Sequence, residues 1–124
     1  MKIKAIELIN ATNEIRENLN GIKSVPLLIK IIVTLKVLDD ILDPIKKSID
    51  VVNNKYNNEK NTVVKEGGEV YKPEIVRLLN KDLTALYVTE LKLPESKNKL
   101  TTDEIELLPS AMYKALYTLY NYLT

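Results

Sequence analysis

The amino-acid sequence predicts a mainly α protein with a minor β component: an antiparallel helical hairpin, two further helices, and a small β-hairpin or short sheet of two to three strands. Two long stretches carry apolar residues at helical spacing, helix-start and helix-stop signals flank them, and strand-like alternation is confined to short segments. The chain has 124 residues, of which 45% are hydrophobic. A chain of this length buries roughly two thirds of its unfolded surface, so we expect one domain over residues 1–124.

The first predicted helix covers residues 2–19. Its apolar side chains recur every three or four residues among polar ones, which is typical of an amphipathic helix. They are Ile6, Leu8, Ile9, Ile15 and Leu19. Asn20-Gly21 follows, and glycine commonly ends a helix because it adopts the left-handed conformation without steric cost.

A longer helix is predicted over residues 25–56, with Ser24 as its N-cap and Pro26 in its first turn. Its apolar seam alternates steps of three and four, and consists of Leu28, Ile31, Leu35, Leu38, Leu42, Ile45, Ile49, Val52 and Tyr56. Pro44 interrupts the hydrogen bonding, so either the helix kinks there or Asp43 caps a new helix. Because the seam keeps its phase across Pro44, we expect one long kinked helix. We expect it to pair with the first helix, although the seam could also pair between chains.

The rest of the chain alternates short elements. Residues 57–72 are polar and centred on Gly67-Gly68, which predicts either a β-hairpin or a mobile loop. A helix over residues 73–83 begins at Pro73, and a strand over residues 85–93 is expected to pair with the 63–71 segment. A final helix over residues 102–123 starts with the capping signature of residues 101–104 and is interrupted at Pro109.

The composition excludes several classes of function. Neither cysteine nor histidine occurs, so thiolate chemistry, histidine bases and the commonest metal ligands are all missing. With 18 basic and 17 acidic residues the formal charge is +1, which disfavours both nucleic-acid binding and phosphate mimicry. We therefore expect no enzyme, no cofactor and no membrane segment, since residues 25–38 are too short and carry two lysines. Charges within the first twelve residues are unlike a signal peptide, so a cytoplasmic location is expected.

One acidic cluster invites a metal-site hypothesis. Asp39 and Asp43 lie one helical turn apart with Asp40 beside them, as a two-carboxylate magnesium site requires. The alternative is a solvated helix face paired with Lys36, Lys46 and Lys47. This alternative is favoured because the sequence supplies no further ligands, and no metal is predicted.

The last helix carries two separate stripes. Its core stripe consists of Met112, Leu116, Leu119 and Leu123. Tyr113, Tyr117 and Tyr120 share a second face about a quarter-turn away, and tyrosine is enriched at binding hot spots. These three tyrosines are the predicted partner-binding residues. The alternative is that their rings cover the margin of the core with their hydroxyls in water.

The order of these parts resembles small, functionally unassigned proteins of phages and prophages from low-GC Gram-positive and related bacteria. The resemblance rests on the opening MKIKAIELINA, the apolar helix after Val25-Pro26, the Leu78-Leu79-Asn80 stretch, and the LLPSA stretch at residues 107–111. The tyrosine-rich end departs from the more acidic ends of that group.

The resemblance implies two classes of function. The first is a protein-binding module that inhibits a host defence protein, in the manner of an anti-CRISPR protein, through the tyrosine face and the 57–72 segment. The second is a virion structural or assembly protein that self-associates through the long helical seam. The expected partner is a host or phage protein or a further copy of the chain, without specificity for nucleic acid.

Overall fold

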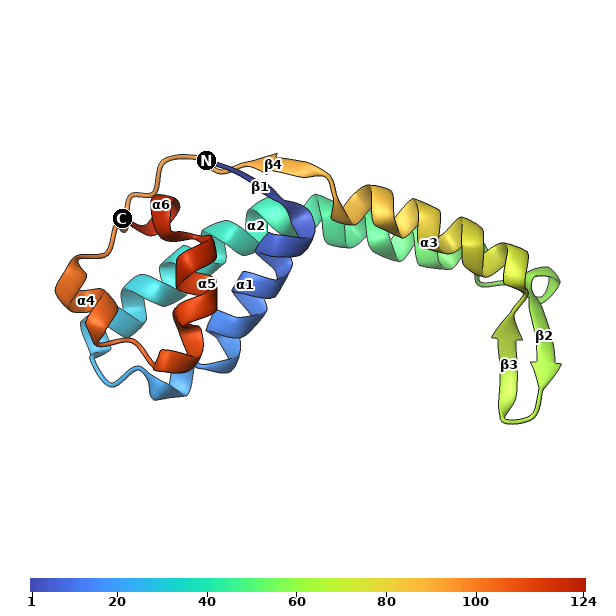
Figure 1. Cartoon of the computed structure of the whole chain (residues 1–124), viewed down its shortest axis with the longest axis horizontal. Coiled ribbons are helices and arrows are strands. Elements are labelled where there is room, and N and C mark those ends of the chain that lie inside the picture. Colours follow the sequence, from blue (N-terminus) through green and yellow to red (C-terminus); the bar gives the residue numbers. More distant parts are fainter. The chain divides into compact units, whose positions relative to one another are not determined.

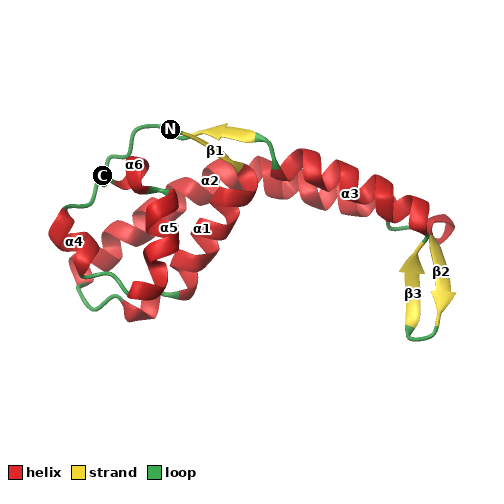
Figure 2. Ribbon diagram, viewed as in Figure 1, coloured by secondary structure: helices red, strands yellow, loops and turns green.

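The structure is a computed structural model that describes all residues 1–124. The chain is mainly helical with two small antiparallel two-stranded sheets, which confirms the predicted fold class (Figure 1, Figure 2). Its residues group into two compact units. The first unit comprises residues 1–42 and 90–124, and the second comprises residues 43–89.

The first unit opens with a strand where the sequence predicted a helix. Strand β1 (Lys2–Lys4) precedes helix α1 (Ala5–Glu17) and pairs antiparallel with strand β4 (Glu90–Lys92). Ile3 is buried on this strand, and its partner in the ladder is Leu91. The prediction of a helix from residue 2 was wrong because a distant strand provides hydrogen-bond partners for these backbone groups, which local periodicity does not reveal.

The predicted pairing of the 85–93 strand with the 63–71 segment was also wrong. Helix α3 (Pro73–Tyr87) extends four residues beyond its predicted end, which leaves only the three residues of β4 extended. The 63–71 segment instead closes on itself, since β2 (Thr62–Lys65) pairs antiparallel with β3 (Gly68–Tyr71). Strand β4 therefore has a different partner from the one expected, whereas the β2–β3 pairing is the hairpin that was one of the two alternatives for residues 57–72.

Helix α2 (Val25–Tyr56) is one helix that continues past Pro44, as the phase of its seam predicted. Its residues 25–42 belong to the first unit and its residues 43–56 to the second. The carbonyl of Pro44 accepts a hydrogen bond from the Ser48 hydroxyl at 2.8 Å, and Asp43 pairs with Lys47 at 2.9 Å. Because α2 runs without a break from Val25 to Tyr56, no fresh helix begins at Pro44.

The core of the first unit joins α1, the first part of α2 and the C-terminal helices. Its fully buried side chains include Leu8, Ile15, Ile31, Leu38, Leu42, Met112, Leu119 and Leu123. The Arg16 guanidinium of α1 contacts both carboxylate oxygens of Asp39 on α2, at 2.6 and 2.7 Å. The closest packing neighbour of α1 is nevertheless α5 (Tyr113–Thr118), so α1 and α2 do not form a self-sufficient pair (Figure 1).

The predicted interrupted helix over residues 102–123 is divided more finely than expected. Helix α4 (Thr102–Glu106) is followed by a 3₁₀ turn at Ser110–Met112, α5, and the single-turn helix α6 (Tyr120–Leu123). The interruption at Pro109 was predicted, whereas the second one, at Leu119, was not. Thr101 forms the predicted capping box with Glu104, because each side chain accepts a hydrogen bond from the other residue's backbone N–H.

The second unit consists of the end of α2, the β2–β3 hairpin and α3. The structure thereby selects the hairpin over the mobile loop (Figure 2). Gly67 and Gly68 form the turn of this hairpin with φ angles of 95° and 124°, which residues that carry a Cβ rarely adopt. The Tyr56 hydroxyl donates a 2.6 Å hydrogen bond to Asp82 of α3. No residue of α3 is buried, and within this unit only Ile45 and Tyr56 are, each with an exposed fraction of 8%.

Candidate partner-binding site

The three predicted tyrosines lie on the C-terminal helices of the first unit, Tyr113 and Tyr117 on α5 and Tyr120 on α6. Their exposed fractions are 51%, 86% and 56%, respectively. No hydroxyl of the three makes a hydrogen bond within the chain, so all three remain available to donate and accept. Rings that merely sealed the core would be covered more fully, which makes the exposed fraction of Tyr117 difficult to explain by packing alone.

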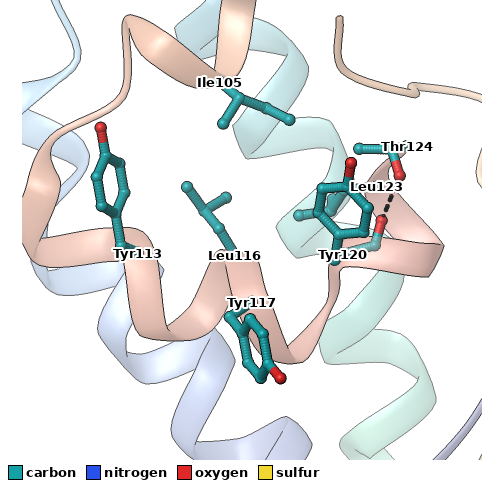
Figure 3. A pocket seen from close by; sticks show the side chains of 7 residues that line it. All are labelled: Ile105, Tyr113, Leu116, Tyr117, Tyr120, Leu123 and Thr124. Carbon is teal, nitrogen blue, oxygen red and sulfur yellow. Dashed lines mark hydrogen bonds between the residues drawn. The ribbon is translucent and has the colours of Figure 1, made fainter. Parts of the chain in front are cut away.

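These tyrosines line a shallow apolar hollow of about 270 Å³. Leu116 and Leu123, both buried, contribute to its lining beside Thr124. Figure 3 shows Tyr113 and Tyr120 on either side of Leu116, with Ile105 of α4 facing them and Tyr117 pointing away from Ile105. The hollow therefore has two walls. The three tyrosines form the aromatic wall, and Ile105 of α4 forms the aliphatic wall.

Helix α4 is held in place by Glu104, the residue before Ile105. The Lys30 ammonium of α2 donates hydrogen bonds to both carboxylate oxygens of Glu104, at 2.8 and 3.1 Å. These bonds lower the pKa of Glu104 below its ordinary value, and the hydrogen bond from the backbone of Thr101 lowers it further. The aliphatic wall thus depends on an ion pair and a capping box formed by the same carboxylate.

The core stripe predicted beneath the tyrosines is confirmed. Met112, Leu116, Leu119 and Leu123 are all buried, with exposed fractions of 6% or less. Two residues were not identified from the sequence: Tyr122 in the core and Ile105 in the lining of the hollow. Tyr122 is buried, and its helical spacing from Ala115 and Leu119 was a signal that could have revealed it. Ile105 carries no such signal, because only the tertiary structure brings α4 to this face.

The acidic residues Asp39, Asp40 and Asp43 do not converge on a common point. Asp39 pairs with Arg16, Asp40 with Lys36 at 3.0 Å, and Asp43 with Lys47. Each carboxylate is thus compensated by a different base, and no group of three potential metal-ligating residues occurs in the chain. Asp40 and Asp43 thus pair with lysines of their own helix, as the solvated-face alternative expected, whereas Asp39 pairs with Arg16 of α1.

The long seam of α2 faces inward where it crosses the first unit. Ile31, Leu35, Leu38 and Leu42 all belong to the core cluster of that unit. Self-association through this part of the seam, the mechanism expected for a virion component, would require the core to open. The exposed apolar residues of α2 in this unit are outside the buried cluster, and they are Val25, Ile29, Ile32, Val33 and Val37.

Comparisons with known proteins found no matching family model, no matching curated protein and no matching solved structure. None of the helices is long and apolar enough to span a bilayer. Fold and site together define a small, mainly helical protein that presents an aromatic hollow at its surface.

Proposed function

We propose that this chain is a non-enzymatic protein-binding module whose contact surface is the hollow lined by Tyr113, Tyr117 and Tyr120. The observation that carries the proposal is the combination of three exposed tyrosines with an apolar floor. Tyrosine and other large aromatic residues dominate binding hot spots because they bury much area at little entropic cost. The partner supplies apolar side chains that enter the hollow and polar groups that meet the hydroxyls.

The size of the hollow favours a protein ligand over a small molecule. Pockets for drug-sized ligands usually span about 300–1,000 Å³ and enclose most of the ligand. The hollow here has about 270 Å³ and is lined almost entirely by apolar surface. It suits one or two anchoring side chains of a larger surface, which is how hot spots of protein interfaces pair.

The electrostatics of the site support contact with protein rather than nucleic acid. No charged side chain lines the hollow, and the whole chain has a net charge of +1. Binding to the phosphate backbone relies on clustered lysine and arginine, and mimicry of it relies on clustered acids. Neither kind of cluster contributes here.

The resemblance to phage and prophage proteins suggests which partner to test first. Small phage proteins of this kind commonly bind and block a host machine, so the proposed target is a host defence protein, and the proposed action is inhibition by contact. The site has no charged anchor, so the affinity for the target should depend only weakly on salt concentration.

The test is affinity capture from the host bacterium followed by binding measurements with the purified partner. The triple variant Y113A/Y117A/Y120A should bind at least about tenfold more weakly, since large hot spots cost more than 2 kcal/mol each on truncation. Ile105→Glu tests the opposite wall, because it places a charge in the apolar hollow. Tyr87→Ala at the end of α3 is the matched control, because Tyr87 lies outside both the hollow and the 57–72 segment, and it should bind normally. Equal binding by the triple variant and the parent, with the fold intact by circular dichroism, would reject this surface.

A further inference from the structure

The tyrosine hollow, lined by Tyr113, Tyr117 and Tyr120, offers hydrogen-bond donors in an otherwise apolar setting. Its remaining lining consists of Ile105, Leu116, Leu123 and Thr124. The Thr124 hydroxyl is already used, since it donates to the backbone carbonyl of Tyr120 at 2.7 Å (Figure 3). The three tyrosine hydroxyls have no partner in the chain. A ligand that fits the hollow is therefore mainly apolar and brings acceptors for these hydroxyls.

Apart from the three hydroxyls, the hollow offers a ligand no free acceptor of its own. The backbone beneath it is paired within the helices, because Leu119 N donates to Ala115 O at 3.0 Å and Leu123 N to Leu119 O at 2.9 Å. A backbone N–H of the ligand that is buried here would lose its hydrogen bond to water without replacement. Proline carries a backbone carbonyl but no N–H, so a proline-rich segment avoids this cost.

The spacing of the aromatic rings matches the repeat of an extended proline-rich chain. Tyr113 and Tyr120 lie on either side of Leu116 (Figure 3). They are seven positions apart in sequence, which is about 10 Å along a helix at 1.5 Å per residue. A polyproline II helix repeats every three residues, which is about 9 Å at 3.1 Å per residue. Two prolines one turn apart can therefore each contact one of the two rings.

The charged residues near the hollow leave it suited to a neutral ligand. Glu104 is paired with Lys30, and the exposed Glu106 does not contribute to the lining. Lys114 lines a different depression, between α1 and α5. A helical ligand is less suitable than a proline-rich one, because the carbonyls within a helix are already paired and cannot accept from the tyrosine hydroxyls.

We infer that the tyrosine hollow binds a proline-rich segment in the polyproline II conformation, whose carbonyls accept hydrogen bonds from the tyrosine hydroxyls. This inference rests on the proposed function and names the chemistry of the partner's contact segment. Prolines pack against the rings of Tyr113 and Tyr120, and Ile105 covers the segment from the opposite wall. The conformation exists before binding, so little entropy is lost. For an isolated peptide we expect a dissociation constant on the order of 100 µM.

An NMR titration of the isotope-labelled full chain with a capped oligoproline peptide of about ten residues tests the inference. The peptide should shift the resonances of Ile105 and of residues 113–124 and should saturate them. A capped peptide of alternating glycine and serine controls for general peptide binding and should cause no shifts. A capped helical peptide of alanine, leucine and glutamine represents the alternative ligand. Absence of oligoproline binding up to about 2 mM, or tighter binding of the helical peptide, would overturn the inference.

Substitution by phenylalanine separates the hydroxyls from the rings. The variant Y113F/Y117F/Y120F keeps the aromatic area and loses the donors, so it should bind oligoproline at least about threefold more weakly than the parent. Y113A/Y117A/Y120A should bind at least about tenfold more weakly. Tyr87→Phe is the matched control and should bind like the parent, because Tyr87 lies on α3 outside the hollow. Equal affinity of the triple phenylalanine variant and the parent, with both folded by circular dichroism, would show that the hydroxyls are not donors and would overturn the inference.

The outcomes distinguish this inference from the proposed function. If the triple alanine variant loses the host partner but the parent does not bind oligoproline, the protein-binding function stands and the proline-rich ligand is wrong. If the parent binds oligoproline through the hollow but the triple alanine variant keeps the host partner, the ligand chemistry stands and the proposed contact surface for the host protein is wrong.

Discussion

Replacing Glu104 by Gln probes the contact that holds the aliphatic wall of the tyrosine hollow. Glutamine retains the acceptor of the capping box at the third helical position, but it loses the charge that pairs with Lys30. The side chains of Lys30 and Glu104 are 29% and 25% exposed, so solvent screens the pair less than a fully exposed one. With two hydrogen bonds at 2.8 and 3.1 Å, we expect the pair to contribute about 1 kcal/mol, the upper end for pairs near the surface.

Urea and thermal denaturation at pH 7 would measure this loss. A destabilisation of about 1 kcal/mol corresponds to a decrease in Tm of about 4 °C for a chain of this size. The double-mutant cycle with Lys30→Met isolates the pairwise energy from other effects of each substitution. Glu95→Gln is the control, because Glu95 pairs with Lys99 at 3.2 Å in a largely exposed position. It should change stability by less than about 0.5 kcal/mol.

The pH dependence has a defined sign. The pKa of Glu104 is lowered in the folded chain, chiefly by the Lys30 ammonium. Its stabilising contribution is therefore fully present above the unfolded pKa of about 4.3 and is lost as the pH falls through the folded value. The difference between parent and E104Q should shrink at pH 3. A difference that is the same at pH 3 and pH 7, or a coupling energy of zero in the cycle, would refute the role assigned to this ion pair.

Two further predictions concern the core and the second unit. Leu38→Ala removes a fully buried side chain and should lower the free energy of unfolding by about 3 kcal/mol. Val51→Ala, at an exposed site, should change it by less than about 0.5 kcal/mol. Equal effects of the two substitutions in urea denaturation would contradict the assigned burial. The hydrogen bond to Asp82 raises the pKa of Tyr56 above its ordinary value, so this contribution to stability is present below pH about 10 and is lost as the pH rises through the folded pKa. Asp82→Asn should lower the pKa of Tyr56 in an NMR titration of labelled tyrosine, and an unchanged pKa would exclude Asp82 as the cause.

Local signals in the sequence were sufficient to predict a feature when all the residues that determine it lie in one segment of the chain. The Thr101 capping box, the continuous helix across Pro44 and the buried Met112 stripe were all predicted correctly. Each depends on residues within one or two helical turns, so spacing alone reveals it. Tyr113, Tyr117 and Tyr120, which also lie within two turns, line one hollow, and their role in partner binding stays a prediction.

Predictions failed where the determinant was the identity of a distant partner. Residues 2–4 continue the helical pattern of α1, yet they form a strand because Glu90–Lys92 lies beside them. The expected pairing of the 63–71 segment with the 85–93 strand does not occur, because that segment closes into the hairpin that was the other predicted use of its residues. Hydrogen bonding between strands is non-local, and a strand of three residues has too little pattern to specify its neighbour.

The sequence by itself determined which side chains share a face, because the periods of helix and strand are properties of the backbone. Only the tertiary structure decided which of those faces are covered. The apolar stretch at residues 25–38 fits a core helix, yet one of its faces is buried against α1 and α5 while Val25, Ile29 and Val33 remain in solvent. Likewise, Ile105 completes the tyrosine hollow because α4 packs against the core and is tied to α2 by Lys30, which is 74 residues away from Glu104 in the chain. Burial depends on what packs against a face, and that information is distributed over the whole chain.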